Sequence, residues 1–108
     1  MEIRKTIDAN GVTIFLEGRF TFDDRKNFHE IAFLFPEENV TNIVVDFERL
    51  EYIDSTGVGM LLIMHENAQK RGIKVRAINV GHYVEPVFKQ SALGNLFKVA
   101  YKKDQEQQ

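Results

Sequence analysis

The chain has 108 residues, of which 44% are hydrophobic and 28% are charged, which is enough for one globular domain with a sizeable core. Its formal net charge is −2, with lysines and arginines scattered along the chain, so the sequence carries no electrostatic footprint for nucleic acid. It contains no cysteine, which excludes a disulfide framework and thiolate chemistry and fits a reducing compartment.

The N-terminus lacks the apolar stretch of a signal peptide. No apolar run approaches the roughly 20 residues that a membrane-spanning helix needs. We therefore expect a soluble, cytoplasmic protein that does not contact a membrane.

Two alternating apolar runs open the chain, at residues 3–7 and 12–16, and Asn10 and Gly11 separate them. An Asn-Gly pair between alternating segments is a strong hairpin signal, because both turn positions take positive φ. We therefore predict that the first two strands are antiparallel neighbours.

The next segment predicts a helix that runs to about Phe35 and is stopped by Pro36. The residues able to cap its start are Thr21, Asp23 and Asp24. Apolar side chains recur in it at the spacing of one helical face, at Phe28, Ile31, Ala32 and Phe35. We expect this aromatic stripe to lie in the core.

A nearly continuous β-branched run from Val40 to Phe47 predicts a central strand that is covered on both faces. After a short connection, a helix is predicted from Ser55 to about Arg71, with Gly72 ending it. Residues 73–78 predict another strand, with Ile73, Val75 and Ala77 on one side.

The C-terminal third predicts smaller elements. The spacing of Val84, Val87 and Phe88 is typical of a short amphipathic helix. The apolar residues between Leu93 and Val99 should pack back on the sheet as a short strand or turn. The tail 102–108 is polar, and we expect it to be frayed.

This order of elements predicts a single α/β domain over residues 1–101, built on right-handed crossovers. We expect a mixed β-sheet with an N-terminal antiparallel hairpin and with helices packed against it. Sites in such sheets gather at the carboxyl ends of strands, where Ser55 is expected to lie.

The segment from Asp54 to Met64 reads D-S-T-G-V-G-M-L-L-I-M. Ser55 is the expected N-cap of the helix, because its hydroxyl can accept a hydrogen bond from the first turn. Gly57 and Gly59 lie inside that turn, where a glycine weakens a helix by roughly 1 kcal/mol. They leave bare backbone that another chain or an anion can approach at the positive end of the helix dipole.

The same helix has two apolar faces. The face expected to meet the sheet carries Val58, Leu61, Leu62, His65 and Ala68. The face expected to point away carries Met60, Ile63, Met64 and Asn67. Exposed methionine and isoleucine beside a candidate site indicate a docking surface. The alternative is that the last helix or the C-terminal segment covers them.

Several motifs together carry a resemblance to a known family. They are L-E-G-R-F, I-V-V-D-F, Y-I-D-S-T-G-V-G-M-L-L, the helix end K-R-G and the closing Q-S-A-L-G-N-L-F. In this combination, the chain from Val12 to Val99 resembles the STAS-domain family of bacterial anti-sigma factor antagonists. The expected fold is accordingly a single STAS-like domain.

The resemblance implies a phosphorylation switch at Ser55, the serine directly after the aspartate of the motif. The unmodified protein would bind an anti-sigma factor or serine kinase and so free a sigma factor. Phosphorylation of Ser55 by the kinase would release that partner, and a serine/threonine phosphatase of the metal-dependent class would restore the cycle. The expected oligomeric state is a monomer or a weak dimer.

Thr21, Asp23 and Asp24 follow the second predicted strand, in the loop that the family uses beside the phosphorylation site. Many members carry an acidic residue at the position of Thr21, so this chain departs from the family pattern there. Thr56 is an alternative phosphate acceptor, and Asp54 either bonds the helix start or faces a partner. The full set of predicted partner-binding residues is Thr21, Asp23, Asp24, Asp54, Thr56, Gly57, Gly59, Met60, Ile63 and Met64.

Enzyme chemistry has little support in the sequence. His29, His65 and His82 are dispersed, and the chain has no G-x-S-x-G elbow that would make a serine nucleophile. It also lacks an H-x-x-x-H pair and a Walker lysine, so no metal or cofactor is expected. Weak nucleotide binding at the start of the Ser55 helix stays open. The alternative function is a STAS subunit of a lipid-transport or sensor complex, with Ser55 as a docking residue.

Overall fold

The computed structural model describes residues 1–9, 11–32 and 40–102. In these residues, strands form a single five-stranded sheet in the order β1-β2-β3-β4-β5. Their bounds are β1 Glu2–Ile7, β2 Gly11–Phe20, β3 Asn42–Ile53, β4 Lys74–Val80 and β5 Lys98–Tyr101. The pair β1 and β2 is antiparallel, whereas the other neighbours are parallel. The predicted fold class, a mixed α/β sheet with an N-terminal hairpin, is confirmed.

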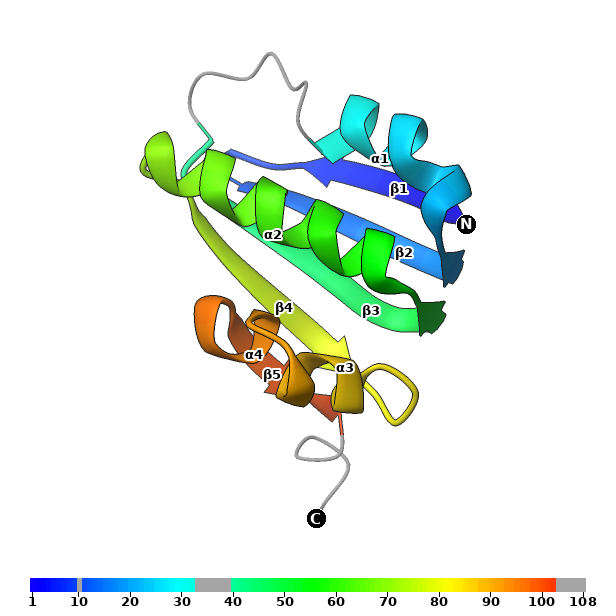
Figure 1. Ribbon diagram of the computed structural model, residues 1–108. Helices are drawn as coiled ribbons and strands as arrows, with labels where there is room; N and C mark the ends of the chain where they lie inside the picture. Colours follow the sequence, from blue (N-terminus) through cyan, green and yellow to red (C-terminus); the bar gives the residue numbers. More distant parts are fainter. Residues whose placement is uncertain (10, 33–39, 103–108) are drawn as a thin grey trace.

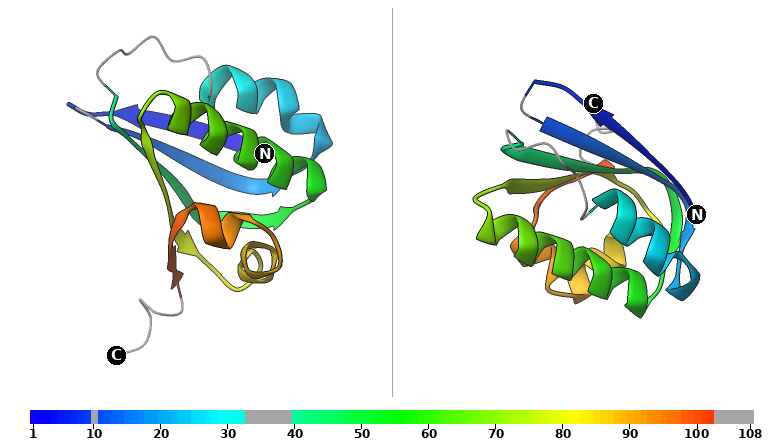
Figure 2. Two further views of the ribbon diagram at one scale, coloured as in Figure 1. Left: turned by 60° about the vertical axis from the view of Figure 1, so that its left-hand side comes forward. Right: turned by 90° about the horizontal axis from the view of Figure 1, so that it is seen from above.

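The helices all lie on one face of this sheet, as the view from above in Figure 2 shows. They are a short 3₁₀ helix η1 (Phe22–Asp24), α1 (Arg25–Ala32), α2 (Ser55–Lys70), α3 (Glu85–Gln90) and α4 (Leu93–Leu96). The prediction that the central strand is covered on both faces is therefore wrong. In β3 the side chains of Ile43 and Val45 are buried, but those of Val44 and Asp46 on the other face are only half-buried.

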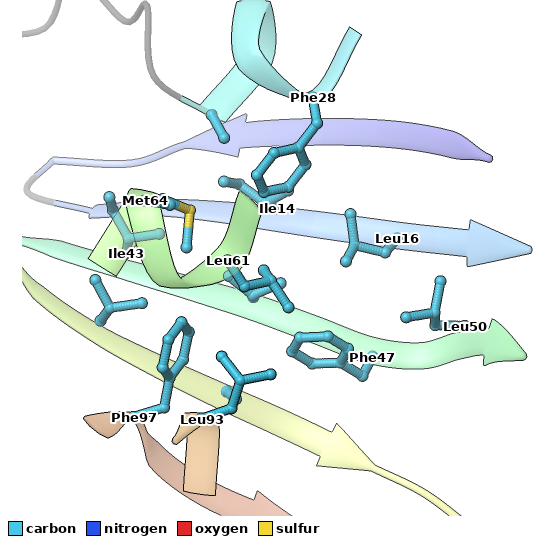
Figure 3. Close-up of a cluster of buried hydrophobic side chains, with 14 of the residues drawn as sticks. Ile14, Leu16, Phe28, Ile43, Phe47, Leu50, Leu61, Met64, Leu93 and Phe97 are labelled. Carbon is cyan, nitrogen blue, oxygen red and sulfur yellow. The ribbon is translucent and has the colours of Figure 1, made fainter. Parts of the chain in front are cut away.

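The core lies between the sheet and the helices, and Figure 3 shows part of it. Strands β2 and β3 supply Ile14, Leu16, Ile43 and Phe47, which lie on the same side of the sheet as Leu61 of α2 and Leu93 of α4. The Phe47 ring meets that of Phe88 edge-on, with the centroids 5.1 Å apart. Burying one such side chain stabilises the fold by about 1.5–3 kcal/mol, so this layer provides most of the cohesion.

The hairpin between β1 and β2 forms as predicted, but its turn is shifted by one residue. The Asp8 N–H donates to the Gly11 carbonyl oxygen at 3.0 Å, and the Gly11 N–H donates to Asp8 Oδ1 at 2.8 Å. Gly11 thus opens β2, and its φ is not positive. Asn10 lies outside the described residues. The side chain of Asp8 thus adds a second hydrogen bond across the turn.

The segment after β2 begins with η1 and continues directly into α1. Thr21 precedes the first turn, and its N–H donates to Asp24 Oδ2 at 2.8 Å. Phe28 and Ala32 are buried as predicted, and Ile31 is half-buried. The predicted end of this helix at Phe35 and Pro36 lies outside the described residues.

The last apolar segment, predicted as a short strand or turn, contains both. The segment Leu93–Leu96 is a helical turn, α4, and the strand β5 begins only after it. Leu96 is consequently 48% exposed, while Leu93 and Phe97 enter the core. The tail beyond residue 102 lies outside the described residues. Within the described ranges, no helix combines the length and apolar character needed to cross a bilayer.

Candidate functional site

The candidate site lies where β3 ends and α2 begins, and Figure 1 shows α2 running back along the sheet from that point. Strand β3 continues to Ile53, well beyond the apolar run that predicted it. Phe20 of β2 is the register partner of Ile53, so the residues that follow the two strands lie side by side. The Asp54 N–H donates to the Phe20 carbonyl oxygen at 3.1 Å. This parallel pairing fixes the position of the helix start.

Asp54 caps α2, and the prediction that Ser55 does so is wrong. Asp54 has extended backbone angles, and its Oδ1 accepts a hydrogen bond from the Gly57 N–H at 2.9 Å. Its Oδ2 accepts from the Phe22 N–H at 3.3 Å. Because Ile53 is the last strand residue, the cap position falls on Asp54. Of the two roles left open for Asp54, the structure shows the bonded one: its carboxylate ties the helix start to η1.

Ser55 is the first residue of α2, and its side chain is exposed. Its hydroxyl makes no hydrogen bond to the described part of the chain. The helix behind it has 16 residues, so its N-terminal end carries a partial positive charge. Thr56, the alternative acceptor, is half-buried. Of the two hydroxyls, that of Ser55 is the more accessible to another protein.

The two glycines of this turn have different surroundings. A Cβ at Gly57 would lie 2.7 Å from Ile53 Cγ1 and 3.0 Å from the Phe20 carbonyl oxygen, so the helix backbone packs directly on the strand ends. Gly57 is buried, and the prediction that a partner approaches its backbone is wrong. A Cβ at Gly59 would meet nothing within 4 Å. The bare backbone expected at this helix start is therefore found only at Gly59.

The buried face of α2 is rotated from the predicted one. It consists of Gly57, Leu61, Met64 and Ala68. The prediction that Met64 points away from the core, on a docking surface, is wrong because its side chain is only 2% exposed. Helix α1 packs beside α2, and Met64 lies near Ala32 of α1 and Ile43 of β3. Helix α2 thus packs against α1 as well as against the sheet.

The remaining side chains of α2 divide between partial and full exposure. Ile63 is 48% exposed, and Met60 is half-buried against the core. Val58, Leu62 and His65, which were predicted to meet the sheet, are half-buried as well. An apolar surface therefore remains near Ser55, centred on Ile63 and Met60, but it is smaller than predicted.

In the loop after β2, Asp23 is exposed and Thr21 is half-buried. Asp24 is buried, with 9% exposure. Its Oδ1 accepts a hydrogen bond from the Met1 amino group at 3.1 Å, while its Oδ2 holds the Thr21 N–H. Because this carboxylate is used to shape the loop, little of it is left for the predicted partner contact.

Sequence reasoning missed two exposed aromatic residues at this end of the sheet. Phe22 is 56% exposed, and the guanidinium of Arg25 lies 3.7 Å from its ring centroid. Tyr52 is 41% exposed, with the Arg19 guanidinium 4.1 Å from its ring centroid. A signal for Phe22 was present, because it falls outside the helical spacing of the buried residues Phe28 and Ala32. Aromatic residues and arginine are both enriched at protein interfaces.

Comparison with known proteins gives consistent results. The family model described as "Mlab, STAS domain" matches residues 3–99. A STAS-domain containing protein of Pseudomonas aeruginosa (strain UCBPP-PA14) is 28% identical over 93 residues, covering 86% of this chain and 91% of that protein.

Solved structures share the fold. The anti-sigma factor antagonist SpoIIAA in its unphosphorylated form has a TM-score of 0.68 at 23% identity, covering 83% of this chain and 84% of that one. A putative anti-sigma factor antagonist from Thermotoga maritima has a TM-score of 0.80 at 18% identity, covering 92% and 85%. A sulfate transporter family protein from Wolinella succinogenes has a TM-score of 0.76 at 18% identity, covering 91% and 81%.

Proposed function

Because this chain belongs to the STAS-domain family described as "Mlab, STAS domain", whose members are regulatory or binding domains rather than enzymes, we propose that it is an anti-sigma factor antagonist. The STAS fold is shared by anti-sigma factor antagonists and by domains of sulfate transporters. In the proposed cycle, the protein binds an anti-sigma factor or switch kinase while Ser55 is unmodified. Phosphorylation of Ser55 releases the partner, and a metal-dependent serine/threonine phosphatase reverses it.

The observation that carries this proposal is the exposure of Ser55 at the start of a long helix whose other first-turn groups are engaged in the fold. Asp54 is held by two backbone N–H groups, and Gly57 is packed on the strand ends. Among the described residues, the Ser55 hydroxyl makes no hydrogen bond that supports the fold. It can therefore be modified without removing a contact that supports the domain.

Charge explains why phosphorylation would affect binding more than folding. A phosphate adds about −1.5 to −2 charge, and a helix N-terminus favours negative charge by about 0.3–1 kcal/mol. A docked partner would have to desolvate that group beside the Asp54 carboxylate. Changing a complex from nearly all bound to nearly all free takes about 5.5 kcal/mol, and a buried, doubly charged group provides a large part of that.

The proposed contact surface surrounds Ser55. From the residues predicted earlier it retains Thr21, Asp23, Thr56, Gly59, Met60 and Ile63. The exposed ring of Phe22 is a natural addition, because the Phe22 N–H is bonded to the same carboxylate that caps α2. Asp54 contributes through that cap and as a neighbouring charge.

The test is phosphorylation with the cognate anti-sigma kinase and ATP, followed by mass spectrometry and a binding measurement. We expect one added phosphate on Ser55, none in Ser55→Ala, and loss of partner binding in Ser55→Asp. The control is Thr56→Ala, which should still accept one phosphate. A Ser55→Asp protein that binds the partner as tightly as the wild type would reject the switch.

The second candidate is a STAS subunit of a lipid-transport or sensor complex outside transcription. It is supported by the likeness to the sulfate transporter family protein and to the STAS domain of a SulP transporter from Vibrio cholerae. In that case Ser55 is a docking residue without modification. Ser55→Ala would then weaken complex assembly, and the protein isolated from its source cells would carry no phosphate on Ser55.

A further inference from the structure

A second surface lies at the opposite end of α2 from Ser55. It is a groove of about 530 Å³ between the C-terminal half of α2, the beginnings of β4 and β5, and α4. Figure 1 shows the end of α2 and the beginning of β4 at the end of the sheet away from the start of α2, with α4 and β5 farther along β4. None of the residues predicted for partner binding lines this groove.

The charge of the groove is uniformly positive. Lys74, Arg76 and Lys98 line it, and no aspartate or glutamate does. Lys74 and Arg76 are two positions apart on β4, so they project from the same face of the sheet, the one opposite to buried Val75 and to the helices, and Lys98 of β5 is the register partner of Arg76. Because β4 has no β5 partner before Arg76, the groove passes over this open edge, with the cations on one side of β4 and Leu96 on the other. Like charges directly opposite one another on neighbouring strands destabilise a sheet. Among the described residues none of these cations forms an ion pair, so the fold does not offset their repulsion.

The groove is also partly apolar. Leu96 is 48% exposed at its border, and Val75 lines it from β4. His65 is half-buried, and its ring lies 5.3 Å from that of Phe97, tilted by 30°. An exposed leucine beside unpaired cations is a combination that favours a ligand with both acidic and apolar side chains.

A simpler reading explains only part of this arrangement. A lysine on an edge strand prevents edge-to-edge pairing between sheets, and β5 is an edge strand. That accounts for Lys98. It also accounts for Lys74, because the pairing of β4 with β5 begins only at Arg76, but it does not account for Arg76, which has strand partners on both sides.

We propose that this groove binds an acidic peptide segment of a second protein. Its carboxylates would pair with Lys74, Arg76 and Lys98, and a bulky apolar side chain would pack against Leu96. A nucleic-acid backbone has no apolar side chain for Leu96, and a concave groove does not match a flat membrane surface. The groove and the surface around Ser55 lie at opposite ends of α2, so a partner can bind at each of them at the same time. This does not depend on the role of Ser55.

The experiment selects binders for the whole chain from a library of random-sequence peptides. We expect the selected peptides to be rich in aspartate and glutamate, with at least one leucine, isoleucine or phenylalanine. Lys74→Glu combined with Lys98→Glu should weaken the best peptide about tenfold or more. The matched control is Lys26→Glu with Arg49→Glu, which changes the net charge equally on exposed residues outside the groove and should leave the affinity within about twofold.

Leu96→Asp provides an independent variant, because this exposed side chain can change without disturbing the core. It should weaken the same peptide and leave the thermal midpoint unchanged. Selected peptides without an acidic preference, or equal affinity for the groove variant and the control, would overturn the proposal. Binding of phosphatidylglycerol vesicles or single-stranded DNA that is lost only in the groove variant would instead assign the site to a membrane or a nucleic acid, and would also overturn it.

Discussion

Gly57 and Gly59 share one turn of α2 but should respond oppositely to the same substitution. Gly57→Ala places a methyl group against Ile53 and Phe20, and overpacking of this kind costs about 1–3 kcal/mol. Gly59→Ala meets open space and gains helix propensity, worth up to about 1 kcal/mol. Urea unfolding of both variants measures the difference. Equal stability of the two would show that the helix start does not pack on the strand ends as described.

Met64 and Ile63 are adjacent residues with opposite surroundings. Met64→Ala removes a buried side chain between α1, α2 and β3, and should lower the free energy of unfolding by about 2–5 kcal/mol. Ile63→Ala, the control, should change it by no more than about 0.5 kcal/mol, because Ile63 is half exposed on the surface. Partner binding should be affected in the opposite way: Ile63→Ala should weaken it more than Met64→Ala does. A stable Met64→Ala protein would restore the docking face predicted from sequence.

At the scale of elements, the junction of β3 and α2 depends on the Asp54 carboxylate. Asp54→Ala should cost about 0.5–2 kcal/mol, because it removes an N-cap. Asp54→Asn keeps an acceptor oxygen and should cost much less. The amide NMR signals of Gly57 and Phe22 should both shift in Asp54→Ala, since one carboxylate accepts from both N–H groups. A shift of only one of them would show that η1 and α2 are not linked through this side chain.

The sequence predicts the elements better than it predicts their contacts. Local patterns predict the hairpin, the central strand and the helix that begins at Ser55, and the structure has all three. The cap of α2 could not be assigned locally, because Asp54 and Ser55 are both good cap residues. The choice depends on where β3 ends, which the pairing of Ile53 with Phe20 decides.

The buried face of α2 escaped prediction for a similar reason. Its rotation toward Met64 depends on α1, a neighbour that lies far away in the sequence. At the site itself, the motif located Ser55, but the packing of Gly57 and the inward carboxylate of Asp24 result from tertiary contacts. Local pattern thus indicates where the candidate site lies, and long-range packing decides which of its residues are exposed.

At the scale of the whole molecule, stability should be highest in the middle of the sheet. Strands β2, β3 and β4 each have a strand on both sides and supply the core, whereas β1 and β5 are edges. We expect amide hydrogen exchange to be slowest in β2 to β4 and faster in β5, which pairs over only a few residues. NMR-detected exchange in deuterated buffer measures this directly. Slowest exchange in β5 would contradict the assignment of the core.

Strand β3 is paired over unequal lengths with its two neighbours, β2 and β4. Strand β3 pairs with β4 only as far as Asp46, whereas its pairing with β2 continues to Ile53. The last part of β3 therefore has a strand partner on one side only, and Ser55 follows its end. Contacts at that end reach β2 and β3 through backbone hydrogen bonds, whereas they reach the β4 and β5 side only through side chains, such as the Lys102–Glu48 ion pair. Exchange of the proposed partner at the start of α2 is therefore expected to leave the proposed groove at the other end of the helix largely undisturbed.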